Sequence, residues 1–159
     1  MQAMKKTKYS HYQVLEILKY FSESIQGFDD KQLREASAHE AMLYAAENGI
    51  IEFINAMWEA NHDLLSVVDN SNRGIFWYAI QNRRRNVFKL IHSLNGLEME
   101  MFANQKDTFG SNLLHTAGYF DPLSNRGSRS GPAMQIQKEI RWFKVSHLSQ
   151  FTHRYYFIG

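Results

Sequence analysis

The sequence of 159 residues contains no cysteine. Without cysteine the chain forms no disulfide, has no thiolate nucleophile and offers no zinc site with cysteine ligands. This absence excludes several enzyme classes and metal-binding modules. It is also consistent with a protein of the reducing cytoplasm.

Long apolar runs and a strong net charge are missing as well. No stretch approaches the roughly 18 apolar residues that a membrane helix needs, and no apolar signal-peptide region follows the basic residues 1–8. The formal net charge of +2 is too small to indicate a polyanionic partner. With 44% hydrophobic and 14% aromatic residues, the composition predicts one soluble, cytoplasmic folded unit.

What the chain does contain is apolar residues at helical spacing. Valine, leucine, phenylalanine and isoleucine recur every three or four positions and predict an amphipathic helix over residues 12–25, after a basic N-terminal tail over residues 1–11. Ser10 and Gln13 have the spacing of a capping box at the start of this helix. A polar linker is expected after Gly27.

Two pairs of short antiparallel helices are expected next. The first helix begins at a capping box of Ser37 and Glu40 and ends at Gly49, because glycine tolerates a left-handed turn. Its partner ends at Asn61. The second pair carries its apolar residues on both helices, namely Phe76, Ala79, Ile80, Val87, Phe88, Leu90 and Ile91.

Small residues mark the recurrence of this two-helix unit. Ala45 and Ala79 are 34 residues apart, and Ala79 and Ala117 are 38 residues apart. Both periods are close to the ~33 residues of an ankyrin repeat. The sequence therefore predicts three copies, near residues 40–65, 69–94 and 107–120.

The third copy has the most specific motif. Residues 107–117, DTFGSNLLHTA, resemble the ankyrin pattern of aspartate, two variable residues, glycine, then Thr-Pro-Leu-His-x-Ala, with Asn-Leu in place of Thr-Pro. Gly110 permits a tight finger turn, and the small Ala117 lets neighbouring helices approach. The second copy is more degenerate, because Asn72 and Arg83 stand where the pattern has its turn glycine and its inter-helix glycine.

The order of segments resembles the plant ankyrin-repeat proteins with a C-terminal PGG membrane domain, of the accelerated-cell-death and salt-tolerance-regulator type. The resemblance rests on residues 45–53, AAENGIIEF, on residues 69–90, and above all on residues 130–144, SGPAMQIQKEIRWFK. The family has Ser-Gly-Ala-Ala-Leu-Gln-Met-Gln-Arg-Glu-Leu-x-Trp-Phe-Lys in this last place. Pro132 departs from the family's alanine.

This resemblance implies an all-α fold. The expected architecture is an ankyrin-repeat solenoid of about three degenerate helix-turn-helix repeats with flanking capping helices, spanning residues 12–144 and ending with a helix over residues 132–144. It also implies protein interaction in stress or defence signalling, with relatives tethered to a membrane. Because residues 145–159 diverge and lack the membrane helices, the chain is expected to be a truncated member.

Catalysis and cofactor binding are not expected. His62, His92 and His115 fall in different copies without a metal-binding spacing, and His115 is expected to make structural hydrogen bonds at the repeat turn. No nucleophile elbow, phosphate-binding loop or useful pair of carboxylates is present. We therefore assign no catalytic, metal or cofactor residue.

A run of three arginines over residues 83–85 is the best nucleic-acid candidate, since guanidinium groups contact phosphates. In the ankyrin register, however, this run lies in the loop between two helices of one copy. We interpret it as a solvated surface loop and do not expect a nucleic-acid partner.

The candidate partner-binding residues follow from the same register, because fingers and inner helices form the concave face of an ankyrin array. They are Asn70, Ser71, Arg73, Gln81, Asn82, Thr108, Phe109, Ser111, Tyr119 and Phe120. Three aromatic residues in one copy, Phe109, Tyr119 and Phe120, indicate either a partner site or a surface that a further repeat would cover. The sequence leaves both alternatives open.

The leading hypothesis is a module that binds other proteins, including membrane-tethered relatives, and not small molecules. The alternative is a non-functional or dominant-negative fragment of a membrane-tethered signalling protein, and an enzyme is a distant third. Three repeats are near the minimum for a stable stack, so self-association through exposed end surfaces is also expected.

Overall fold

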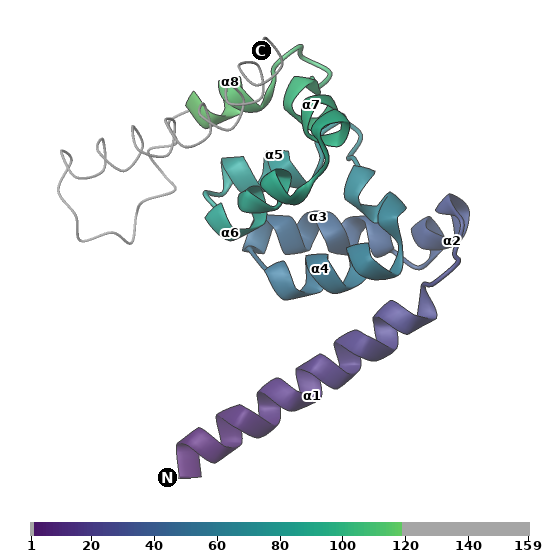
Figure 1. The fold of residues 1–159 in the computed structure, drawn as a ribbon, viewed down its shortest axis with the longest axis vertical. Helices are drawn as coiled ribbons and strands as arrows, with labels where there is room; N and C mark the ends of the chain where they lie inside the picture. The colour runs from purple at the N-terminus through teal and green to yellow at the C-terminus, as the bar shows by residue number, and fades with distance from the viewer. Residues whose placement is uncertain (1, 119–159) are drawn as a thin grey trace, which may run out of the picture.

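The computed structural model describes residues 2–118, and this part of the chain is all α-helical (Figure 1). Within it there is no β-strand, only two isolated bridges. The elements in chain order are α1 (Gln2–Ser24), α2 (Asp30–Glu35), α3 (Ala38–Asn48), α4 (Ile51–Ala60), the 3-10 helix η1 (His62–Ser66), α5 (Ile75–Gln81), α6 (Arg85–Phe88), the 3-10 helix η2 (Lys89–Ser93), α7 (Gly96–Asn104) and α8 (Leu113–Gly118).

The helices pack in neighbouring pairs. α3 packs against α5, and α5 packs against α8, so these three helices form one row. α4 returns along α3 and α6 returns along α5, which places a second row behind the first. α1 lies against α4, and its N-terminal end extends away from the other helices (Figure 1). The predicted helix over residues 132–144 and the tail over 145–159 lie outside the described residues.

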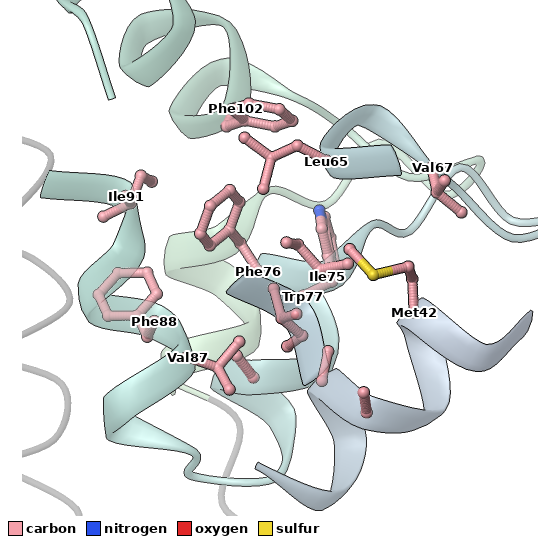
Figure 2. Close-up of a cluster of buried hydrophobic side chains, with 14 of the residues drawn as sticks. Met42, Leu65, Val67, Ile75, Phe76, Trp77, Val87, Phe88, Ile91 and Phe102 are labelled. Carbon is pink, nitrogen blue, oxygen red and sulfur yellow. The ribbon is translucent and has the colours of Figure 1, made fainter. Parts of the chain in front are cut away.

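The core lies between the two rows and is built from the apolar residues that the helical spacing indicated. Met42 and Ile54 in the first pair and Phe76 and Phe88 in the second are buried. In Figure 2, Phe76 points toward Phe102 of α7, and the two rings meet edge to face with centroids 5.1 Å apart. This contact attaches α7 to the row of inner helices.

The two helix pairs α3–α4 and α5–α6 turn in the same way. Gly49 and Arg83 both adopt left-handed backbone, with φ of 77° and 58°. The next N–H in each turn, of Ile50 and of Arg84, donates to the carbonyl of the alanine five residues before it, at 2.9 and 2.7 Å. The predicted end of a helix at Gly49 is confirmed, and Arg83 does occupy the conformation of a turn glycine.

Several predicted boundaries near the N-terminus are wrong. α1 begins at Gln2, so residues 2–11 are helical, and Ser10 lies inside the helix and does not cap it. The expected linker after Gly27 contains α2, because Asp29 and Gln32 form a reciprocal capping box. Ser37 makes no side-chain cap, since its left-handed φ of 55° turns the chain from α2 into α3.

Helix α7 was not predicted at all. It begins at a capping box in which Asn95 accepts from the Glu98 N–H at 3.0 Å and the Glu98 carboxylate accepts from the Asn95 N–H at 3.3 Å. Only Phe102 of this helix is buried, so the apolar periodicity is weak. The sequence signal that was available is the spacing of Asn95 and Glu98.

Candidate partner-binding face

Two turns of the same geometry precede α5 and α8, at residues 69–73 and 107–111, and we refer to them as the finger turns. In the first, the Asp69 Oδ1 accepts from the N–H groups of Ser71 and Arg73, both at 2.8 Å. In the second, the Asp107 Oδ1 accepts from the N–H groups two and four residues later, at 3.0 and 2.9 Å. An aspartate that bonds the backbone ahead of it fixes such a turn locally.

Each finger turn also needs one residue in left-handed backbone. Asn72 has φ of 62° and Gly110 has φ of 77°. Asparagine is one of the few residues other than glycine that adopts this region readily. The substitution that made the second copy look degenerate is therefore compatible with the turn.

The two finger turns contact each other directly. The Thr108 N–H donates to the Ser71 carbonyl at 3.0 Å, and the Asn72 Nδ2 donates to the Lys106 carbonyl at 2.7 Å. Gln105 Nε2 donates to the Asn72 carbonyl at 3.3 Å. These bonds hold residues more than thirty positions apart in the chain in one platform.

Phe109 is a large apolar group that this platform leaves exposed, with 78% of its surface accessible. The Arg73 guanidinium carbon lies 5.9 Å from the centre of the Phe109 ring, within the range of a cation–π contact. The Arg73 Nε also lies 3.5 Å from Oδ2 of the buried Asp107. The exposed Phe109 ring thus lies beside Arg73, and Arg73 also contacts Asp107, which belongs to the same finger turn as Phe109.

The finger turns continue into the exposed side of α5. The Tyr78 hydroxyl donates to Asp69 Oδ2 at 3.1 Å. Partial burial, the charge of Asp69 and this hydrogen bond together raise the pKa of Tyr78 above its ordinary value of 10. Gln81 is exposed, and the partly buried Asn82 donates from Nδ2 to the Tyr78 carbonyl at 3.0 Å.

Sequence reasoning missed the part of this face that lies on α3. Tyr44 precedes Tyr78 by 34 residues, and 64% of its surface is exposed. Asn48 donates from Nδ2 to the Tyr44 carbonyl at 2.9 Å, which repeats the bond between Asn82 and Tyr78. The 34-residue offset that relates Ala45 to Ala79 also relates these two exposed positions and is the signal in the sequence.

The structure therefore places six of the ten predicted residues in the finger turns and two more, Gln81 and Asn82, at the C-terminal end of α5. Asn70, Gln81, Thr108 and Phe109 are exposed, as predicted. The other four are partly buried, and their backbone or side-chain groups help to build the turns: Ser71, Arg73, Asn82 and Ser111. Tyr119 and Phe120 lie outside the described residues.

The arginine run follows Gln81 and Asn82 directly, between α5 and α6, and two of its side chains make hydrogen bonds within the fold. The Arg84 Nε donates to the Glu47 carbonyl at the end of α3 at 2.7 Å, and an Arg83 terminal nitrogen donates to the Ile80 carbonyl at 2.9 Å. Carbonyls at helix C-termini favour such cations. Two of the three guanidinium groups thus have structural partners, while Arg85 is exposed.

In the part of the chain that the structure describes, the histidines do not gather into a site. Within residues 2–118, no three histidine, aspartate or glutamate side chains lie close enough together to hold a metal ion. His115 makes the expected structural bond, because its Nδ1 lies 2.7 Å from Asn112 Oδ1 at the start of α8. In the same part of the chain, no helix combines the length and the apolar character needed to cross a membrane.

The geometry of this face is therefore defined by matching turns, matching helix pairs and a set of exposed aromatic and amide side chains. No protein-family model, no curated protein sequence and no solved structure matches this chain.

Proposed function

We propose that the chain is a degenerate ankyrin-repeat array that binds another protein through the finger turns and the exposed side of α3 and α5. The observation that carries the proposal is the pair of finger turns, which share an aspartate cap, a left-handed fourth residue and direct contact with each other. Ankyrin arrays use this combination of adjoining fingers and inner helices as a binding surface.

The helix pairs support the same proposal. α3–α4 and α5–α6 turn through equivalent residues 34 positions apart, and α8 follows α5 in the row. Stacked two-helix units that contact only their neighbours are typical of repeat proteins. The plant family with the PGG domain remains the relative that the sequence motifs favour, and stress or defence signalling is the proposed context.

The chemistry of the face also supports a protein partner. Its exposed groups are the rings of Tyr44 and Phe109 and the amides of Asn48, Asn70 and Gln81. Tyrosine supplies large contact area at low conformational entropy cost, and amides supply adaptable hydrogen bonds. This mixture is characteristic of surfaces that recognise other proteins.

The test is a selection of binding peptides from a displayed library on the full chain. We expect peptides whose dissociation constant rises on the order of tenfold when Phe109→Ser or Tyr44→Ser is introduced. The matched control is Leu97→Ser, which removes an exposed apolar residue from α7, outside the finger turns. Binding is measured by biolayer interferometry on all four proteins.

Two results would contradict the proposal. Peptides that bind the Phe109 and Tyr44 variants as tightly as the native chain would place recognition elsewhere. Recovery of no binding peptide at all would favour the alternative that the chain is a non-functional fragment.

A further inference from the structure

The sequence contains two Asn-Gly pairs, at residues 48–49 and 95–96. In such a pair the glycine nitrogen can attack the carboxamide carbon of the asparagine, because glycine has no side chain to hinder the approach. The attack releases ammonia and closes a cyclic imide, which water then opens. The two pairs have different surroundings in the structure, so we expect them to react at different rates.

The pair at residues 48–49 is held by hydrogen bonds at the end of α3. The Gly49 N–H donates to the Ala45 carbonyl, and the Asn48 Nδ2 donates to the Tyr44 carbonyl at 2.9 Å. The Arg84 side chain lies over Gly49, since a Cβ added there would be 3.0 Å from Arg84 Cδ. Both the attacking nitrogen and the leaving amide are therefore engaged, and the reaction requires the last turn of α3 to open.

The pair at residues 95–96 lies at the start of α7 and is not held in this way. Gly96 is the first residue of the helix, and among the described residues its N–H donates to no protein acceptor. Asn95 uses its Oδ1 to accept from the Glu98 N–H at 3.0 Å, while its Nδ2 donates to no described residue. The attacking nitrogen and the leaving amide are both free.

The first turn of α7 is also weakly attached to the core. Asn95 and Glu98 are exposed, 82% of the Leu97 surface is accessible, and the buried Phe102 lies toward the other end of the helix. A helix end with few buried contacts opens at a low free-energy cost. Such opening lets the Gly96 nitrogen approach the carboxamide carbon of Asn95.

We propose that Asn95 is a site of spontaneous deamidation, with the Gly96 nitrogen as nucleophile and water as the second reactant. A bond forms between Gly96 N and Asn95 Cγ, and the bond between Cγ and Nδ2 breaks. The amide nitrogen leaves as ammonia, taking the proton of the Gly96 N–H. Water then cleaves the imide at either of its carbonyls and gives aspartate or isoaspartate at position 95.

The two products have different effects on α7. Aspartate keeps the main chain and is as good an N-cap residue as asparagine. Isoaspartate routes the main chain through Cβ and Cγ, which displaces the carbonyl of residue 95 that accepts from the Met99 N–H at 2.9 Å, and also the reciprocal cap with Glu98. The isoaspartate form therefore loosens the first turn of α7. No group of the finger turns takes part, so the inference is independent of the proposed function.

Incubation of the full chain in neutral buffer, followed by mass spectrometry of tryptic peptides, compares the two pairs. Cleavage after lysine and arginine places them in separate peptides. We expect product at Asn95 to accumulate roughly tenfold faster than at Asn48, because the reaction at Asn48 must first break backbone hydrogen bonds. In urea the two rates should converge, since the difference comes from the fold. No product at Asn95, equal rates in the native chain, or an unchanged ratio in urea overturns the proposal.

Gly96→Ala is the matched variant, because position 96 is helical and accepts a Cβ. It should slow the reaction at Asn95 several-fold and leave Asn48 unchanged, and an unchanged rate at Asn95 would contradict attack by the nitrogen of residue 96. Asn95→Asp reproduces one product, and its α7 amides should exchange hydrogen at the native rate. The purified isoaspartate form should exchange faster in α7 alone, and native exchange there would overturn the effect on the helix.

Discussion

At the scale of single residues, the aspartates of the finger turns each accept two backbone N–H bonds. Asp107 is buried, accepts two backbone N–H bonds and lies beside Arg73. We expect Asp107→Ala to lower the free energy of unfolding by about 2 kcal/mol, because hydrogen bonds to a charged acceptor are lost. Urea denaturation measures it against Asp63→Ala, an exposed aspartate, and equal losses for the two would contradict this account.

Gly49 and Gly110 have the same backbone conformation, so replacing each with alanine distinguishes the cost of backbone strain from the cost of a steric contact. Gly49 and Gly110 both have φ of 77°, but a Cβ at Gly49 would lie 3.0 Å from Arg84 Cδ, whereas nothing lies within 4 Å at Gly110. We expect Gly110→Ala to cost about 1 kcal/mol from left-handed strain alone. Gly49→Ala should cost more, because it also displaces the arginine that caps α3. Equal costs in urea denaturation would show that the arginine adjusts freely.

Tyr78 makes stability depend on pH at the alkaline end. Because its pKa is raised above 10 in the folded chain, the folded state holds a proton that the unfolded state has already released. Its contribution is therefore complete below pH 10 and is lost as the pH rises toward the folded pKa. The ultraviolet titration of the native chain, after subtraction of the titration of Tyr78→Phe, should show one phenol with a midpoint above pH 10. A midpoint at or below pH 10 would contradict the assignment.

At the scale of elements, α7 is anchored chiefly by Phe102, with Met99 partly buried beside the core. Phe102 is the buried residue of this helix and packs edge to face on Phe76. Phe102→Ala should lower the free energy of unfolding by about 3 kcal/mol, whereas the exposed neighbour Met101→Ala should change it by less than about 0.5 kcal/mol. Hydrogen exchange should also speed up selectively in α7. If exchange instead rises uniformly, α7 is not a separately attached element.

The elements that the sequence predicts best are those fixed by local backbone chemistry. The end of α3 at Gly49 and the turn before α8 follow from a glycine or an aspartate at a set offset, and the structure confirms both. The boundaries that failed depend on competition between neighbours: Ser10 has the spacing of a cap, but no proline or glycine interrupts the helix on either side of it. Apolar periodicity could not reveal α7, which buries a single residue.

The same difference between local and long-range contacts explains which parts of the candidate site could be predicted from the sequence. Each finger turn could be predicted from its own residues, but their contact with each other joins groups 34 positions apart, as between Asn72 and Lys106. No local pattern encodes such a bond. Tyr44 was missed for a related reason, since its place on the face is defined only by the packing of α3 against α5.

At the scale of the whole molecule, the described helices should unfold from the periphery inward. α5 packs against both α3 and α8 as well as against α6, whereas the N-terminal part of α1 lies away from the other helices (Figure 1). In native-state hydrogen exchange we expect the slowest amides in α5, with opening free energies near the global value, and the fastest in the first turns of α1. Each element's protection would then follow the number of its packed neighbours. If α1 and α5 instead exchange at the same rate in dilute protein, the described helices open as one cooperative unit, and the picture of a row stabilised by neighbour contacts is wrong.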